Sequence, residues 1–456
     1  MPETYKPGST ERYEVIYITD GEWGTNLFSY IYGFAQGEHY VPPVIIVGIP
    51  NRYMGEANQR DRDFLPVHIA QPAISGGAGE FLTFIKNELI PYVDKKYPTN
   101  GTNSIYGHSY GGLFVLYALL AEPNLFEAYY ATDPPFRWNN DFLITRAAAQ
   151  LNKLSSDKIL WIAGIESTYK DQGIDRLDSV LQRVAPTKLH WKMVTYLNEK
   201  HNSVRLKAMY DGIKFVYSGY SGGPPIFHPM NGIVLKDKPI SVWVESQPEL
   251  RYTIDGTEPD RGSQKIDGML TLAGGAQLVV KSFSNSGKYD KTTRGNFILG
   301  DPLRSSAKPA NARAGGLRYL YYEGNWEKLP DFRKLNPVKT GIADSSFTVK
   351  RLPEKEHFAC LFEGYFEIPE DGYYIFALVS DDGSRLYIGD KLIVDNDGAR
   401  FAENVQSFVL PLVQGFYPVR LEYFQKEGGS VLQLMCVRPG AENPGSFPLK
   451  YQYYEE

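Results

Sequence analysis

The first part of the chain alternates between short apolar runs and longer stretches with helical spacing. Six runs of β-branched and apolar residues are typical of buried strands, at residues 14–19, 44–49, 104–106, 128–132, 159–163 and 189–196. Between them, apolar residues recur every three or four positions, as at Phe81, Ile85 and Leu89, where Pro91 would bend the helix. Strands that alternate with helices predict a mostly parallel sheet covered on both faces.

After residue 222 the pattern changes to short alternating strands without helices between them. The linker Ser221-Gly222-Gly223-Pro224-Pro225 marks the change. Strand patterns follow at 240–245, 250–254, 277–282, 362–368, 373–379, 385–388, 416–424 and 431–437. A chain of 456 residues is too long for one core. We therefore expect an α/β domain at 1–222 and two all-β domains at 223–302 and 310–456.

The turn Gly107-His108-Ser109-Tyr110-Gly111 stands between a predicted strand and an apolar helical run at 113–120. A G-x-S-x-G turn in that setting is typical of a nucleophile elbow, whose glycines allow a strained backbone and close chain approach. It predicts Ser109 as a nucleophile and the N–H of Tyr110 as a donor to an oxyanion. The alternative is an ordinary glycine-rich turn between a strand and a helix.

The general base is expected at the end of another strand, because sites in parallel sheets lie at the carboxyl ends of the strands. His201 follows the last predicted strand and precedes a helix. Imidazole titrates near neutrality, so it can take and return the serine proton. His108 is expected to pack beneath the turn, and His68 is a further candidate for the wall of the cleft. Serine, acid and histidine in this order indicate an α/β-hydrolase fold.

Three carboxylates compete to be the acid that orients His201. Glu166 is the first choice, because the strand before it ends in Gly164. Asp171 lies in the same loop, and Asp133 follows the preceding strand. Each could equally be a solvated loop carboxylate, and a Ser–His dyad without an acid is also open.

Residues 1 to about 222 resemble the esterase family that contains enterobactin esterases, feruloyl and acetyl-xylan esterases and the esterase D group. The resemblance is carried by residues 17–21, 47–50, 60–66, 76–82, 88–91, 107–112, 123–126 and 201–204. It implies that the second oxyanion N–H lies near Glu22. The family's Ser-Pro-Ser-Leu-Trp-Trp segment stands here as 133–138, beginning with Asp133. Family members carry further strands before a segment like 5–9, so this sheet is expected to lack its N-terminal strands.

Two β-domain resemblances follow. Tyr252-Thr253-Ile254-Asp255-Gly256 resembles a motif of the Ig-like module found at the C-terminus of chitobiases and β-hexosaminidases, which implies a spacer. Residues 316–326, 362–366, 372–376, 380–386 and 394–398 resemble the protective-antigen-type β-sandwich domain. In some members of that family a pair of aspartates, matched by Asp381 and Asp382, binds Ca²⁺ and through it a sugar diol; in many bacterial members the pair is structural.

The net charge, the cysteines and the lengths of the apolar runs bear on the partners and the location of the protein. The net charge of −5 gives no sign of a nucleic-acid partner. Cys360 and Cys436 are expected to be buried thiols. No apolar run is long enough to span a membrane, and the polar start Met1-Pro2-Glu3-Thr4 shows no signal peptide. We expect the full-length protein, with the N-terminal strands that this chain is expected to lack, to be extracytoplasmic. We expect no cofactor for catalysis and leave the oligomeric state open.

The predicted function is that of a serine esterase acting on feruloyl or acetyl esters of a glycan. One alternative is a siderophore trilactone esterase, which the same core supports. A second alternative, from another class, is a non-catalytic glycan-binding protein on an esterase scaffold.

Overall fold

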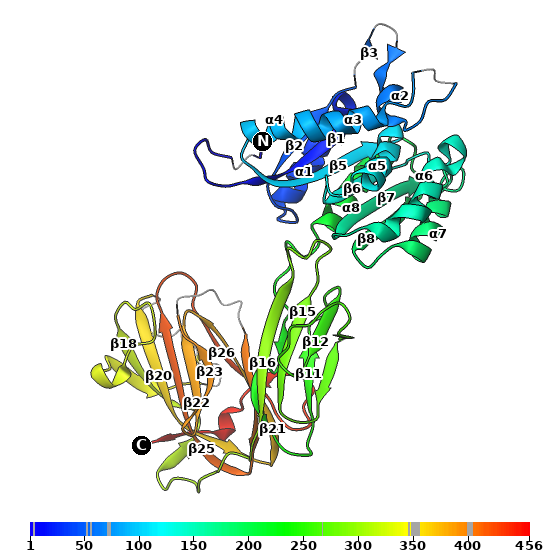
Figure 1. The fold of residues 1–456 in the computed structure, drawn as a ribbon. Coiled ribbons are helices and arrows are strands. Elements are labelled where there is room, and N and C mark those ends of the chain that lie inside the picture. The colour runs from blue at the N-terminus through cyan, green and yellow to red at the C-terminus, as the bar shows by residue number, and fades with distance from the viewer. Residues whose placement is uncertain are drawn as a thin grey trace. The chain divides into compact units, whose positions relative to one another are not determined.

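The structure is a computed structural model that describes residues 1–2, 5–51, 53–54, 57–70, 74–266, 268–344, 347, 356–398 and 405–456. Its internal contacts divide the chain into two units (Figure 1). The first unit comprises residues 1–223 together with 283–290, and the second comprises 224–282 together with 291–456.

The first unit is built on a six-stranded parallel sheet in the order β2-β1-β5-β6-β7-β8. This confirms the predicted α/β-hydrolase-like domain. Its strands are β1 (Tyr13–Thr19), β2 (Val44–Ile49), β5 (Thr99–His108), β6 (Ala128–Thr132), β7 (Lys158–Ile165) and β8 (Leu189–Tyr196), and a small hairpin pairs β3 (Tyr53–Met54) with β4 (Ala57–Asn58). Each long strand lies within a few residues of a predicted one, because strands buried on both faces are apolar throughout.

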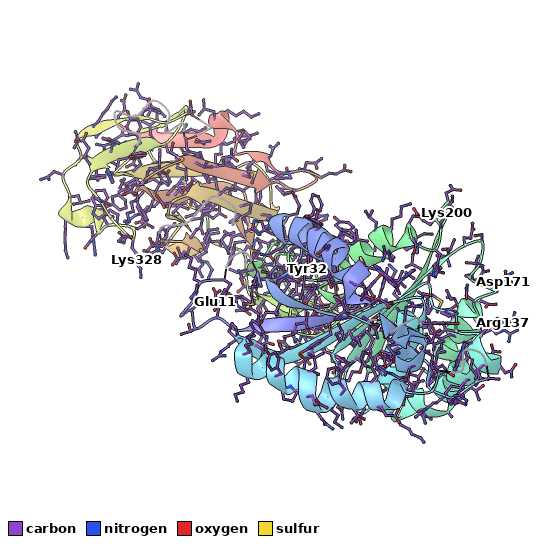
Figure 2. The ribbon with its side chains drawn as sticks, turned by 90° about the horizontal axis from the view of Figure 1, so that it is seen from above. Glu11, Tyr32, Arg137, Asp171, Lys200 and Lys328 are labelled. Carbon is purple, nitrogen blue, oxygen red and sulfur yellow. The ribbon has the colours of Figure 1, made fainter. Side chains whose placement is uncertain are left out.

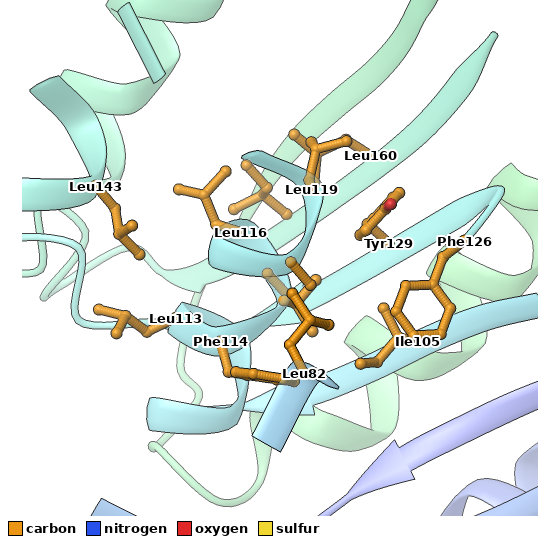
Figure 3. Close-up of a cluster of buried hydrophobic side chains, with 14 of the residues drawn as sticks. Leu82, Ile105, Leu113, Phe114, Leu116, Leu119, Phe126, Tyr129, Leu143 and Leu160 are labelled. Atoms are coloured by element: carbon orange, nitrogen blue, oxygen red, sulfur yellow. The ribbon is translucent and has the colours of Figure 1, made fainter. Parts of the chain in front are cut away.

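Helices cover both faces of this sheet. They are α1 (Gly21–Gly37), α2 (Gln59–Phe64), α3 (Ala78–Phe84), the π-helical turn η1 (Ile85–Leu89), α4 (Ile90–Lys96), α5 (Tyr110–Ala121), α6 (Trp138–Gln150), α7 (Ile174–Val184) and α8 (Val204–Val216). Side chains alternate along β1, so that Val15 and Tyr17 join the larger core, whereas Ile16 and Ile18 pack with α1 and α8. Figure 3 shows the larger core around α5. The packed sheet holds the carboxyl ends of its parallel strands along one edge. The turns that carry the candidate site residues follow these strand ends.

The second unit consists of β-sheets. Its strands are β9 (Phe227–His228), β10 (Asn231–Val234), β11 (Ile240–Val244), β12 (Leu250–Thr253), β13 (Gln264–Lys265), β14 (Met269–Leu272), β15 (Ala276–Ser282), β16 (Lys291–Leu299), β17 (Ala312–Ala314), β18 (Arg318–Glu323), β19 (Lys339–Ile342), β20 (Phe358–Ile368), β21 (Gly372–Asp381), β22 (Ser384–Ile388), β23 (Lys391–Asn396), β24 (Gln406–Leu412), β25 (Gly415–Gln425), β26 (Val431–Val437), β27 (Gly445–Ser446) and β28 (Gln452–Glu455). The C-terminal strands pack around a shared apolar core that includes Phe376 and Leu421, which confirms the predicted β-sandwich.

The two predicted β-domains share one nine-stranded sheet. Strand β10 pairs in parallel with β24, so strands from 231–299 continue into strands of the C-terminal sandwich. Gly232 permits this close pairing, because a Cβ there would lie 2.1 Å from Val409 Cγ1. The Ig-like resemblance is not confirmed, and the boundary near residue 302 stays a prediction.

The two cysteines and the lengths of the apolar helices were also predicted from the sequence. Cys360 and Cys436 are both buried free thiols, as predicted, and burial raises the pKa of each. Within the described ranges, no helix is long and apolar enough to cross a bilayer.

Candidate active site

Ser109 lies in the predicted turn between β5 and α5. Its backbone has φ 58° and ψ −124°, a strained conformation for a residue other than glycine. Its N–H donates to the Thr132 carbonyl at 2.9 Å, which ties the turn to β6. At Gly107 a Cβ would lie 2.1 Å from the Gly111 carbonyl oxygen, so a side chain there would force the turn open. The sequence therefore folds into an elbow that raises the Ser109 side chain above the sheet.

His201 is held by Asp133. The Nδ1 atom of His201 lies 2.5 Å from Asp133 Oδ2, which makes Nδ1 a donor to the carboxylate and leaves Nε2 with a lone pair. The Asp133 side chain is 1% exposed, whereas that of His201 is 47% exposed. Within the described residues, Asp133 Oδ1 is buried without a hydrogen-bond partner. Among the described residues, the side-chain hydrogen bond of this carboxylate is therefore the one to the His201 ring.

Of the three carboxylates predicted as the acid, the structure brings Asp133 into contact with His201. Glu166 was the first choice, but it is exposed at the end of β7 and its N–H donates to the Tyr196 carbonyl. Asp171 is also exposed, and Figure 2 shows it at the outer surface. Asp133 follows β6 with a φ of 45°, and its side chain is buried. The structure therefore brings His201 to Asp133 and not to Glu166.

The two expected oxyanion donors lie at the beginnings of two helices. Tyr110 is the first residue of α5, and Glu22 is the second residue of α1. Backbone N–H groups in the first turn of a helix have no acceptor within it, and the helix dipole adds partial positive charge there. Strands β1 and β5, which lead into these helices, are neighbours in the sheet. The arrangement fits the stabilisation of an oxyanion, which stays a prediction for both N–H groups.

His108 does not pack beneath the turn, as the sequence had suggested. Its ring lies against that of His201, with centroids 4.4 Å apart, and its Nε2 lies 2.7 Å from the His201 carbonyl oxygen. Burial, followed by the nearby His201, lowers the pKa of His108 to about 4. His108 is therefore neutral near pH 7 and donates its Nε2–H to that carbonyl, so it fixes the backbone of His201.

Ser109 and His201 border two cavities. One of about 580 Å³ is also lined by Trp23, Arg60 and Arg205. The other, of about 530 Å³, is lined by Asp133, Ile165, Ser167, Thr168, Gln172, Glu199 and Lys200 among others. Ser109 and His201 are thus accessible from both cavities. His68 lines neither cavity; its Nδ1 lies 3.4 Å from the Ser75 carbonyl oxygen.

The larger of these two cavities carries an ion pair that no sequence pattern predicts. Arg60 Nε donates to Asp20 Oδ1 at 2.8 Å, and the two residues are 40 positions apart in the chain. Burial raises the pKa of Asp20 to about 6, against the lowering effect of Arg60. Arg205 donates to the Asn202 carbonyl at 3.3 Å and makes no ion pair within the described residues. The cavity wall is consequently cationic.

Asp381 and Asp382 lie far along the chain, where β21 ends. Lys426 N–H donates to Asp382 Oδ2 at 2.7 Å, and a Cβ at Gly429 would lie 3.2 Å from Asp381 Oδ2. The loop at 426–429 thus closes over the pair. Among the described residues, no third His, Cys, Asp or Glu joins them in a metal-binding group. The pair fits Ca²⁺ as two carboxylate ligands, and backbone oxygens or water would have to supply the rest of about six to eight ligands.

Family models match two parts of the chain. The model described as "Putative esterase" matches residues 1–204, and the model described as "PA14 domain" matches residues 314–446.

Three similar proteins illustrate the first match. The siderophore triacetylfusarinine C esterase of Aspergillus fumigatus is 34% identical over 155 residues, covering 32% of this chain and 52% of that protein. The ferri-bacillibactin esterase BesA of Bacillus subtilis is 31% identical over 194 residues, covering 38% and 67%. A crystal structure of an IroE-like serine hydrolase from Shewanella oneidensis is 33% identical with a TM-score of 0.43, covering 48% and 74%. The chain thus spans about half the length of the first of these relatives.

Proposed function

The chain belongs to the family described as "Putative esterase", and from this membership we propose that its N-terminal domain is a serine carboxylester hydrolase. The observation that carries the proposal is the 2.5 Å contact between His201 and Asp133, beside the strained elbow that presents Ser109. This contact supports Asp133 in the place of the triad acid.

In the proposed reaction, Ser109 Oγ attacks the ester carbonyl carbon while His201 Nε2 takes the hydroxyl proton. The carbonyl π electrons move to oxygen, and the N–H groups of Tyr110 and Glu22 stabilise the resulting oxyanion. Collapse of this intermediate breaks the bond to the alcohol, which leaves with the proton from His201. Asp133 keeps Nδ1 protonated and stabilises the imidazolium throughout.

The second half of the reaction repeats these steps with water as the nucleophile. His201 Nε2 takes a proton from water as it attacks the acyl-enzyme, and then returns a proton to Ser109 Oγ as the acid leaves. His108 supports both halves, because its hydrogen bond to the His201 carbonyl keeps the base in place.

For the substrate we propose a siderophore ester, of the trilactone type. The Aspergillus fumigatus and Bacillus subtilis relatives carry siderophores in their names, which supports this class over a glycan ester. Arg205 lines the cavity beside Ser109, and a guanidinium group suits the anionic oxygens of a catecholate. Nothing in the comparisons supports feruloyl or acetyl esters of a polysaccharide, so that reading becomes the alternative. An extracytoplasmic location stays an expectation.

A side-by-side assay tests the substrate. We expect kcat/KM for a catecholate trilactone to exceed that for feruloylated xylan by tenfold or more, on the order of what pocket contacts discriminate. In Arg205→Gln the KM for the trilactone should rise about tenfold, the typical effect of losing one hydrogen bond to a charged group. Steady-state kinetics on the full chain give both numbers.

Arg183→Gln is the matched control, because Arg183 lies on α7 and lines neither cavity. A preference for feruloylated xylan would overturn the siderophore assignment while leaving the esterase intact. No turnover of any ester, together with no fluorophosphonate adduct at Ser109, would favour the binding-only reading.

For the C-terminal sandwich we propose Ca²⁺ binding at Asp381 and Asp382. Burial raises the pKa of Asp381, and the neighbouring Asp382 raises it further, so a cation between them would relieve their repulsion. Titration calorimetry of the full chain should show Ca²⁺ binding that Asp381→Asn abolishes. Asp390→Asn, at an exposed position of the same domain, is the control. Equal heats for the wild type and Asp381→Asn would leave the pair a structural role.

A further inference from the structure

Arg60 on α2 contacts two segments that come from different strands. Its Nε donates to Asp20 Oδ1 at 2.8 Å, in the loop after β1. Its Nη2 donates at 3.3 Å to the carbonyl of His108, the last residue of β5. The guanidinium also lies over the Tyr110 ring, 5.4 Å from its centroid. One planar group thus bridges both segments.

Each of these segments carries one of the two expected oxyanion donors. Asp20 precedes Gly21 and Glu22, and its own carbonyl accepts from the N–H groups of Trp23 and Gly24 in the first turn of α1. His108 lies two residues before Tyr110. The spacing between the Glu22 and Tyr110 N–H groups therefore depends on how the loop after β1 sits against the elbow.

Hydrogen bonding between β1 and β5 sets the distance between these two segments only as far as the strands pair. Ile18 on β1 pairs with Tyr106 on β5, and Thr19 Oγ1 donates to the Tyr106 carbonyl at 3.1 Å. Beyond that point the pairing of β1 with β5 ends, and the backbone of Asp20 turns into the left-handed region at φ 51°. Arg60 makes its contacts at this point, where strand pairing no longer holds the two chains.

The bridge is largely shielded from water. The side chains of Arg60 and Asp20 are 16% and 9% exposed. A buried carboxylate needs a close partner, since removing that partner leaves an uncompensated charge. The charged groups around Asp20 are Arg60, Glu22 and Arg205, and Arg60 alone of these forms a direct ion pair with it among the described residues.

We propose that Arg60 is a positioning residue, which, through Asp20 and the His108 carbonyl, holds the N–H groups of Glu22 and Tyr110 at the separation that an oxyanion requires. The inference rests on the proposed ester hydrolysis. It concerns the transition state, because the donors act where charge develops and not on the resting ester. Loss of the bridge should therefore lower kcat and leave KM almost unchanged.

A different role for Arg60 predicts a different result. Arg60 also lines the cavity, so it could instead bind an anionic substrate group directly. Direct binding would appear in KM, and only for anionic esters. Substitution by lysine separates the roles, because lysine keeps the charge but cannot donate in two directions from one rigid plane.

The test uses the full chain with Arg60→Lys, Arg60→Gln, Asp20→Asn and the double variant Arg60→Lys with Asp20→Asn. Two substrates are compared, a neutral p-nitrophenyl ester and one whose acyl chain ends in a carboxylate. We expect kcat to fall about 10- to 100-fold for both esters, somewhat less than when an oxyanion donor is deleted. The KM of each variant should stay within about twofold of the wild-type KM, because the bridge acts on the transition state. The double variant should be no slower than the slower single variant, because both break one bridge.

Arg62→Lys is the matched control, since Arg62 lies on the same helix and pairs with Asp63 away from the elbow. Thermal unfolding of each variant shows that kcat is compared between folded proteins. Wild-type kcat in Arg60→Lys, or a change confined to KM for the anionic ester, would overturn the inference alone. A wild type without Ser109-dependent turnover would overturn the proposed function, and the inference with it.

Discussion

Replacing Ser109 by alanine is expected to lower kcat for a short aryl ester by about 10⁵- to 10⁶-fold, the size of effect seen when the nucleophile of such a unit is removed. The cause is chemical, because alanine offers no oxygen to form the acyl-enzyme. Substrate binding should persist, since both cavities keep their remaining walls. Stopped assays at high enzyme concentration, with fluorophosphonate labelling of both proteins, measure the loss.

The control for this variant is Ser29→Ala, at an exposed position on α1 outside both cavities. It should match the wild type in turnover and in labelling. The thermal unfolding temperature of Ser109→Ala should not fall, because alanine fits the same turn without a new contact. Residual labelling of Ser109→Ala at the wild-type rate would place the nucleophile elsewhere and contradict the assignment.

Much of the first unit could be predicted from the sequence, because its strands and the turn at Ser109 depend on residues that are close together in the chain. Several strands of the parallel sheet are short runs of mostly apolar residues, so the predicted runs 44–49 and 128–132 match β2 and β6 residue for residue. The elbow was predictable for the same reason: Gly107 and Gly111 reflect a close backbone contact within five residues. His201 followed from its place after the last strand, where sites of parallel sheets lie.

The contact of His201 with Asp133 could not be predicted, because Glu166 and Asp133 both follow strand ends. What separates them is burial: the Asp133 side chain is 1% exposed, whereas Glu166 is exposed. That difference depends on packing around the turn and leaves no periodic signal. The Arg60–Asp20 bridge was missed for a related reason, since it joins residues 40 positions apart. The parallel pairing of β10 with β24 is likewise a long-range contact.

Asp133→Asn is the second variant with a large expected effect. Asparagine keeps the size of the side chain, but its amide can present an N–H group to His201 Nδ1. The ring is then held with its proton on Nε2, where the lone pair that accepts the Ser109 proton is needed. We expect kcat to fall by about 10⁴-fold, as when a triad aspartate is replaced in this way. Steady-state kinetics with a short aryl ester measure it.

The structure offers matched comparisons for this prediction in Glu166→Gln and Asp171→Asn. Both remove one loop carboxylate, and both residues are exposed without a hydrogen bond to His201 among the described residues. Their kcat should stay within about twofold of the wild type, in line with ordinary surface substitutions. A large loss in Glu166→Gln with a small one in Asp133→Asn would make Glu166 the acid. Small losses in all three variants would mean that Ser109 and His201 work as a dyad, so the 2.5 Å contact would then position His201 without being needed for turnover.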